Sequence, residues 1–218
     1  MNNRIPLTKK QHSILKKKTI TIVGVGGLGG YVCEYLARIG VGTIKLIDYD
    51  TFDSTNLNRQ IVSNRNNIGQ LKVFETEKRI KEINPKQKVI AINSKITNRN
   101  VFELLQDSDI VIDGLDNIKT RKFVQKACDV LNIYFIHGAI NDWQIQISTI
   151  RPGSNTLNKI YRNTSTIESK TLSFIPPLAA SLEASEAIKV LLNSEDTLEN
   201  KLLIMDLKTN DINIIEVN

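Results

Sequence analysis

The stretch that decides the fold is T-I-T-I-V-G-V-G-G-L-G-G, residues 19–30. Ile20, Ile22, Val23 and Val25 are typical of a strand buried in a sheet, and the apolar residues from position 28 onward change to helical spacing. The glycines therefore lie where a strand turns into a helix.

Gly24, Gly26 and Gly29 match the pattern G-x-G-x-x-G, and Gly27 lies inside it. In this pattern the missing side chains allow a tight turn, let the backbone approach a phosphate, and pack the helix against the strand. The helix N-terminus adds unpaired N–H groups and the positive end of its dipole. The pattern predicts a nucleotide site, although a purely structural turn uses the same residues and Rossmann-like domains bind several nucleotides.

The composition indicates a single globular unit. The chain has 218 residues and a formal net charge of +6. Its lysines are spread over helical faces and the amino terminus without interleaved aromatics, which favours solvated faces, or an acidic protein partner, over nucleic-acid binding. No apolar run approaches membrane-spanning length.

The cysteines point to a reducing compartment. Cys33 and Cys128 are far apart and lie on predicted helices. This argues against a disulfide framework and a cysteine-based zinc site, and it favours packing roles for both thiols. We therefore expect a cytoplasmic protein.

Strands and helices alternate after the glycine turn. This order points to an open, doubly wound, Rossmann-like α/β sheet that is mostly parallel, with its ligand at the carboxyl ends of the strands. We expect helices at 8–17, 69–84, 101–105 and 117–131, and further strands at 43–48, 88–93, 109–113 and 133–140.

The last third changes character. Residues 143–150 alternate between apolar and polar, as in an antiparallel strand with one wet face. We expect a long polar loop at 151–171, a helix opened by Pro176 and Pro177, and closing antiparallel strands at 202–206 and 212–217. We predict one domain over residues 1–218, with a nucleotide-binding part (1–140) and an antiparallel extension (141–218).

Asp48 ends the second predicted strand, about twenty residues past the glycines, where an acidic side chain holds a ribose hydroxyl. A solvated aspartate at a strand end is the alternative.

Arg59 and Lys72 lie on either side of the next loop, so both can reach the same phosphates. Two cations suit a triphosphate better than the pyrophosphate of a dinucleotide.

Asp113 and Asp116 lie at the end of the predicted D-I-V-I-D strand, on the ligand side of the sheet. A carboxylate there can hold Mg²⁺, which prefers oxygen ligands and phosphates. Asn117 follows directly, where it can cap the next helix or bind the ligand.

The sequence here closely resembles the ThiF/MoeB/HesA family, relatives of the ubiquitin-activating enzymes. The resemblance runs from residue 19 to about 217 and is carried by five ordered blocks: G-V-G-G-L-G (24–29), L-I-D-Y-D with S-T-N-L-N-R-Q (46–60), I-G-Q-L-K (68–72), D-G-L-D-N-I-K-T-R (113–121) and S-F-I-P-P-L-A-A-S-L-E-A-S-E-A-I-K-V-L-L (173–192).

The resemblance implies ATP-dependent adenylation of the carboxyl-terminal Gly-Gly of a small ubiquitin-like sulfur-carrier protein, in thiamine, molybdopterin or related sulfur metabolism. It implies that Arg59, Lys72 and Asp116 are catalytic, with Asp116 positioning Mg²⁺. The implied ATP-binding set is Gly24, Gly26, Gly27, Gly29, Asp48, Asp50, Asn56, Arg59, Gln60, Lys72, Asp116 and Asn117.

The sequence lacks several residues that many members of the family have, and this limits the activity that we expect of it. Many relatives bind a structural zinc through two C-x-x-C pairs, and this sequence has none, so we expect no zinc. The 151–171 segment contains no cysteine for sulfur transfer. We therefore expect activity to stop at the acyl-adenylate. Relatives also form homodimers and reach across them with an amino-terminal arginine, for which Arg4 is the one weak candidate.

Other readings remain open. A relative of the same fold could adenylate a small carboxylate on a tRNA base, and an inactive nucleotide-binding partner module would also keep the fold. An NAD-dependent oxidoreductase would leave Arg59, Lys72 and Asp116 without evident roles. We expect His137 to be a hydrogen-bonded residue at a strand end rather than a base, and Trp143 to lie in the core or a dimer interface.

Overall fold

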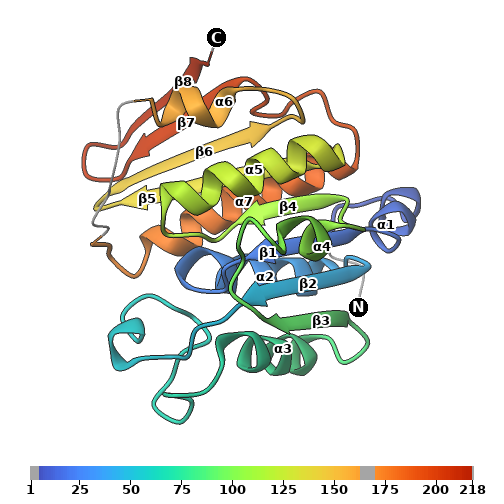
Figure 1. The fold of residues 1–218 in the computed structure, drawn as a ribbon, viewed down its shortest axis with the longest axis vertical. Coiled ribbons are helices and arrows are strands. Elements are labelled where there is room, and N and C mark those ends of the chain that lie inside the picture. Colours follow the sequence, from blue (N-terminus) through green and yellow to red (C-terminus); the bar gives the residue numbers. More distant parts are fainter. Residues whose placement is uncertain (1–4, 163–169, 218) are drawn as a thin grey trace.

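A computed structural model describes residues 5–162 and 170–217 of the chain. Within these segments one eight-stranded sheet has the order β3-β2-β1-β4-β5-β6-β7-β8 (Figure 1). Arg4 and part of the expected 151–171 loop lie outside the described residues.

The first five strands pair in parallel and the last three antiparallel, which confirms the expected mixed sheet. The sheet order reverses between β1 and β4, and this is where an open α/β sheet binds its ligand. The boundary at residue 140 between two parts of the domain stays a prediction. The strands are β1 (Thr19–Val23), β2 (Thr43–Asp48), β3 (Lys88–Asn93), β4 (Ile110–Asp113), β5 (Tyr134–Asn141), β6 (Gln144–Ile150), β7 (Lys201–Asp206) and β8 (Asp211–Glu216).

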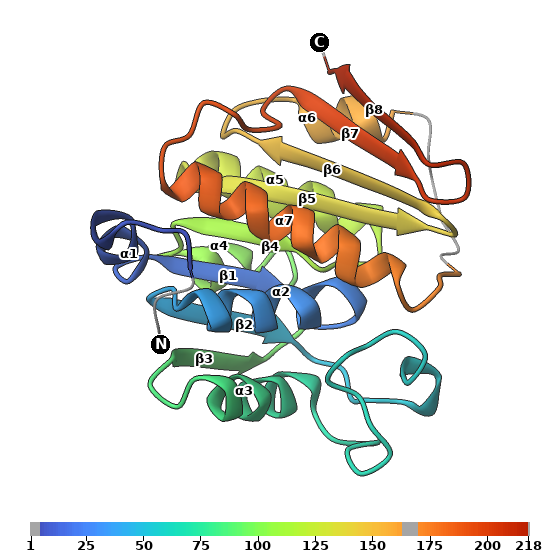
Figure 2. The ribbon, with the colours of Figure 1, turned by 180° about the vertical axis from the view of Figure 1, so that it is seen from behind.

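Helices cover both faces of the parallel strands. Figure 2 shows α2 and α7 side by side on one face, and Figure 1 shows α5 on the other. The face of α2 and α7 also carries α1 and α3, and the face of α5 carries α4 and α6. The helices are α1 (Lys9–Leu15), α2 (Gly27–Ile39), α3 (Lys72–Ile83), α4 (Val101–Leu105), α5 (Ile118–Leu131), α6 (Thr156–Ile160) and α7 (Ile175–Leu191), with a short 3₁₀ turn, η1 (Ser54–Asn56).

Local chemistry sets where these helices begin. The side chain of Asn117 accepts a hydrogen bond from the backbone of Thr120, so Asn117 is the N-cap of α5. Pro176 and Pro177 occupy the first positions of α7, where a missing N–H costs nothing because it has no helical partner. Both helix starts confirm the sequence-based expectation.

Two buried apolar clusters lie on opposite faces of the parallel strands because side chains alternate along each strand. Ile20 and Ile22 pack toward α2, whereas Val23 packs toward α5. Cys33 and Cys128 lie in these clusters, where burial raises the pKa of both thiols. This confirms their packing role and keeps them in the unreactive thiol form.

Two expectations for the last third were wrong in part. The polar face of β6 is not wet throughout: Ser148 is fully buried and donates a hydrogen bond to Lys201 O. Thr149, on the opposite face with Ile145 and Ile147, is also fully buried and donates to the Glu186 carboxylate. The 151–171 segment is not a plain loop, since α6 buries Leu157 under α5. Trp143 is partly buried beside the Phe174 ring, with 5.4 Å between ring centroids.

Glycines let three backbone segments meet at the carboxyl end of β1. Gly24 has a φ of +89°, which L side chains rarely adopt. A Cβ on Gly29 would lie 1.9 Å from Gly24 O, and a Cβ on Gly114 would lie 2.0 Å from the same oxygen. The turn after β1, the start of α2 and the turn after β4 therefore pack backbone to backbone.

Gly29→Ala is expected to destabilise the fold by about 1–3 kcal/mol or more, because the new methyl group overpacks against backbone that cannot move aside. Thermal unfolding of the purified protein measures this. Gly30→Ala is the matched control, since its Cβ would meet its neighbours at ordinary distances of 3.6 Å and above. Equal melting temperatures for the two variants would contradict the packing role of Gly29.

Candidate nucleotide-binding site

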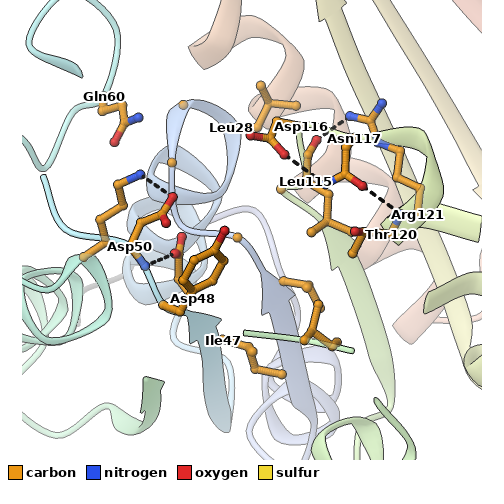
Figure 3. Close-up of a pocket in the computed structure, with 18 of the residues that line it drawn as sticks. Leu28, Ile47, Asp48, Asp50, Gln60, Leu115, Asp116, Asn117, Thr120 and Arg121 are labelled. Atoms are coloured by element: carbon orange, nitrogen blue, oxygen red, sulfur yellow. Dashed lines mark hydrogen bonds and ion pairs between the residues drawn. The ribbon is translucent and has the colours of Figure 1, made fainter. Parts of the chain in front are cut away.

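A cavity of about 380 Å³ lies at the carboxyl ends of the parallel strands, next to the switch point between β1 and β4. Figure 3 shows Asp48 and Asp50 on one side of this cavity and Asp116 and Asn117 on the other. The structure brings eleven of the twelve expected ligand residues to its wall: Gly24, Gly26, Gly27, Asp48, Asp50, Asn56, Arg59, Gln60, Lys72, Asp116 and Asn117. Gly29 is the exception, because it packs α2 onto β1.

The Asp48 carboxylate holds the glycine turn in place. Its Oδ2 accepts a hydrogen bond from Val25 N at 2.8 Å, and its Oδ1 accepts one from Asp50 N at 2.9 Å. Each carboxylate oxygen has a second lone pair, so the same group retains the capacity to accept from a ligand hydroxyl.

The cations of the cavity come from the loop after β2 and from the start of α3. Lys72 is 7% exposed, and its Nζ lies 3.3 Å from Asp50 Oδ2. The Arg59 Nη1 donates to Thr55 O at 3.0 Å and to Asn58 Oδ1 at 2.9 Å. Arg59 thus rests on its own loop at the rim, whereas Lys72 is held inside.

Gln60 and Asn56 complete this wall. The Gln60 amide lies over Gly26, where a Cβ would meet its Nε2 at 3.5 Å. Gln60 Oε1 is buried with no hydrogen-bond partner in the described part of the chain. Asn56 Oδ1 accepts from Asp53 N, which fixes the η1 turn. The unpaired oxygen is an acceptor, so a ligand group that donates a hydrogen bond, such as a hydroxyl or an amine, could complete the site, whereas a phosphate oxygen could not.

Asp116 and Asn117 form the opposite wall. Asp116 is exposed toward the cavity, and its Oδ1 accepts from Asn117 Nδ2 at 3.1 Å. Asn117 uses its own Oδ1 to cap α5. The one short turn after β4 thus presents a carboxylate and an amide next to the start of a helix.

Asp113 does not belong to the cavity wall, and its expected place beside Asp116 as a magnesium-holding carboxylate was wrong. Its side chain is fully buried, with Oδ2 lying 2.9 Å from Arg121 Nε and 2.7 Å from His137 Nδ1. The reason is the two-residue period of a strand: Asp113 shares the face of Val111, which packs toward α5.

His137 is hydrogen-bonded, as expected, but it lies within β5 rather than at its end. It is fully buried, with Nδ1 against Asp113 and Nε2 lying 3.2 Å from the Tyr161 hydroxyl. Burial lowers the pKa of His137 despite the hydrogen bond to Asp113. A neutral imidazole between two partners explains its place without a role as a base.

Glu183, on α7, is the second buried acid near this group. Its carboxyl lies against Gly138, where a Cβ would collide with the Glu183 side chain. Both of its oxygens are buried without a hydrogen-bond partner in the described residues. Burial, with a smaller contribution from Asp113, raises the pKa of Glu183 well above its usual value, against the opposing effect of Arg121. The carboxyl is therefore held in its neutral form.

A third wall of the cavity was not predicted from the sequence. Ser94, Lys95 and Ile96 follow β3 and line the cavity, and Lys95 Nζ lies 4.9 Å from the centroid of the Tyr49 ring. The signal was present, because the carboxyl ends of parallel strands meet at one edge and this segment follows such a strand. Gly114 and Arg121 were also missed as site residues, although both stand in the quoted D-G-L-D-N-I-K-T-R block.

No three or more His, Cys, Asp or Glu side chains within residues 5–162 and 170–217 gather closely enough to hold a metal ion. In the same ranges, no helix is long and apolar enough to cross a membrane.

The fold and the cavity define a Rossmann-like nucleotide-binding protein, with a glycine turn, two nearby cations and an acid at the switch point. The model of the ThiF family matches residues 3–218. The chain belongs to the ThiF family, which confirms the resemblance noted in its sequence.

Several relatives of the chain are named adenylyltransferases. It is 34% identical over 198 residues to a probable molybdopterin-synthase adenylyltransferase of Porphyra purpurea, covering 87% of this chain and 52% of that protein. It is 31% identical over 205 residues to a sulfur carrier protein adenylyltransferase of Thermus thermophilus, covering 88% of this chain and 76% of that protein. The chain thus spans about half the length of the first relative and three quarters of the second.

The structure of E. coli MccB with ATP has a similar fold. The TM-score is 0.82 at 25% sequence identity, over 95% of this chain and 66% of MccB. The chain accordingly shares the core of that larger protein.

Glu183→Gln is expected to raise the melting temperature at pH 8, by about 2–4 °C for each kcal/mol gained. The folded protein keeps the Glu183 proton, whereas the unfolded chain loses it as the pH rises past 4.5, so ionisation favours unfolding of the wild type. The gain should grow with pH and vanish near pH 4. Thermal melts across this range measure it.

Glu186→Gln is the matched control, one helical turn further along α7. The Glu186 carboxylate accepts from Thr149 Oγ1, Leu198 N and Lys189 Nζ, so its loss is expected to lower the melting temperature at pH 8. A difference in melting temperature between Glu183→Gln and the wild type that does not change between pH 4 and pH 8 would contradict a neutral Glu183 in the fold.

Proposed function

We propose that the protein is an ATP-dependent adenylyltransferase that acts on the carboxyl-terminal carboxylate of a small ubiquitin-like sulfur-carrier protein ending in Gly-Gly. The single observation that supports this most is the gathering of Lys72, Arg59, Gln60 and Asp116 around the glycine turn in one cavity. The relatives named for molybdopterin synthase and for a sulfur carrier protein support the substrate class.

The site residues suit an attack on the α-phosphate. A carrier carboxylate oxygen forms a bond to the α-phosphorus, the bond from that phosphorus to the bridging oxygen breaks, and pyrophosphate leaves. Lys72 and Arg59 neutralise the charge that builds up on the leaving pyrophosphate, while the glycine turn and the N-terminus of α2 hold the phosphates. Positioning and charge neutralisation supply the rate, so no side-chain nucleophile is needed.

Asp116 fits a role in holding Mg²⁺. It is an exposed carboxylate at the cavity wall, and Mg²⁺ binds one or two carboxylates together with substrate phosphates and water rather than a cage of protein ligands. An ion held there would supply positive charge that offsets the negative charge of the phosphates.

We further propose a cytoplasmic homodimer. Both cysteines are free and buried, which suits a reducing compartment. The edge strand β8 exposes Ile212, Ile214 and Ile215 at 62%, 57% and 47%, and an apolar edge strand of this kind needs a covering partner.

Sedimentation should give a dimer for the wild type and a monomer for Ile214→Lys; a monomeric wild type would exclude the homodimer.

Arg59→Ala and Asp116→Asn are each expected to reduce carrier-dependent ATP–pyrophosphate exchange about a hundredfold or more. The first removes a positive charge at the phosphates, and the second removes the carboxylate proposed to hold Mg²⁺. The assay uses purified protein, Mg²⁺ and candidate carriers ending in Gly-Gly.

Arg65→Ala is the matched control: Arg65 lies in the same loop as Arg59, is exposed, and does not line the cavity. It should retain exchange close to the wild-type rate. Normal turnover by Asp116→Asn would overturn the assigned role of Asp116, and exchange with no carrier despite bound ATP would favour a non-catalytic partner module.

A further inference from the structure

Arg121 is a buried arginine directly behind the Asp116 turn. It lies on α5, is 6% exposed, and spreads its guanidinium between three structural elements. Its Nη2 donates to Leu115 O at 2.5 Å and to Gly138 O at 3.2 Å, and its Nη1 donates to the Tyr161 hydroxyl at 2.9 Å. The turn after β4, strand β5 and the end of α6 are thus joined by one side chain.

Buried partners hold Arg121 in this position. Its Nε lies 2.9 Å from Asp113 Oδ2, but the N–H does not point at that oxygen, so the contact is an ion pair rather than a hydrogen bond. Tyr161 is placed to donate to His137 Nε2, and His137 Nδ1 to donate to Asp113. These directions form a closed ring, Arg121 to Tyr161 to His137 to Asp113, and Asp113 faces Arg121 again.

The ring fixes the residue that precedes Asp116. Leu115 N donates to Asp113 Oδ1 at 2.9 Å. Leu115 O accepts from Arg121, and Figure 3 shows this contact. Both polar backbone groups of Leu115 are therefore tied to the same buried ion pair. On the other side of Asp116, Asn117 caps α5. The residues before and after Asp116 in the sequence are therefore both held in place.

Stability alone does not account for this arrangement. A buried arginine–aspartate pair is expensive to desolvate, and apolar residues of similar volume are often equally stable. Glu183 and His137 are neutral, so within residues 5–162 and 170–217 Asp113 is the buried carboxylate that pairs with Arg121. A planar guanidinium with donors in a fixed fork can hold several carbonyls in a set geometry, which an ammonium cannot.

We propose that Arg121 is a positioning residue for adenylation: with Asp113, Tyr161 and His137 it clamps the Asp116 turn to β5 and so sets where the Asp116 carboxylate lies in the cavity. The step that Asp116 performs rests on the proposed function. The clamp itself belongs to the free protein and can be measured without any substrate.

Arg121→Lys tests the clamp. Lysine keeps the charge beside Asp113 but cannot bridge Leu115 O, Gly138 O and Tyr161 together. Amide hydrogen exchange of residues 114–117 in the free protein should accelerate about tenfold or more relative to the strands. In carrier-dependent ATP–pyrophosphate exchange, kcat should fall about tenfold or more while the KM for ATP changes less than about threefold.

Arg79→Lys is the control, because Arg79 also pairs with a buried acid, Glu34, but lies away from the cavity. Arg79→Lys should leave amide hydrogen exchange at residues 114–117 and the kcat of ATP–pyrophosphate exchange unchanged. If Arg121→Lys does not fold, Tyr161→Phe carries the test, since it removes only the hydroxyl between Arg121 and His137 and should accelerate exchange at 114–117 to a smaller extent.

The clamp is overturned if amide hydrogen exchange at residues 114–117 in the folded Arg121→Lys variant matches that in the control. It is also overturned if amide hydrogen exchange rises equally over the whole sheet and kcat falls only in proportion to the folded fraction. A wild type that adenylates no carrier defeats the proposed function, but the hydrogen-exchange result still decides the clamp. The two failures are therefore distinguishable.

Discussion

The site depends on the contact between two glycines, Gly24 after β1 and Gly114 after β4. Because neither has a Cβ, the two turns meet backbone to backbone, with Gly114 N donating to Val23 O at 2.8 Å. The Asp48 carboxylate holds the same turn from the β2 side through Val25 N. This contact brings the ends of three strands together around one cavity, and a single methyl group on either glycine would separate them.

The turn after β4 divides its acids between two environments. Asp113, the last residue of β4, points into the protein and pairs with Arg121, whereas Asp116 faces the cavity. The buried acid and its partners determine the shape of the turn, and the exposed acid is left available to a ligand. The short D-G-L-D-N segment thus combines a structural carboxylate with a candidate functional one, and the glycine between them lets the segment pack against Gly24.

Much of the architecture was predictable from local patterns. The strands 43–48 and 88–93 and the helix 101–105 were predicted with the observed bounds, because apolar runs bounded by glycine, proline or polar residues leave few alternatives. The site followed from the topology, since parallel strands end at one edge. The burial of Asp113 and of Ser148 could not be predicted from the sequence, because each depends on groups far away in the chain that pack against it. The inserted helix α6 was hidden by its polar composition.

The most direct measurement of the central claim is the fate of the ATP phosphates in the presence of a Gly-Gly-ending carrier. With ATP labelled at the α-phosphate, the account predicts that label becomes attached to the carrier's carboxyl terminus as AMP and that one pyrophosphate is released for each carrier modified. Transfer of label from the γ-phosphate instead, with release of ADP, would contradict it, because the carboxylate would then have attacked the far end of the triphosphate.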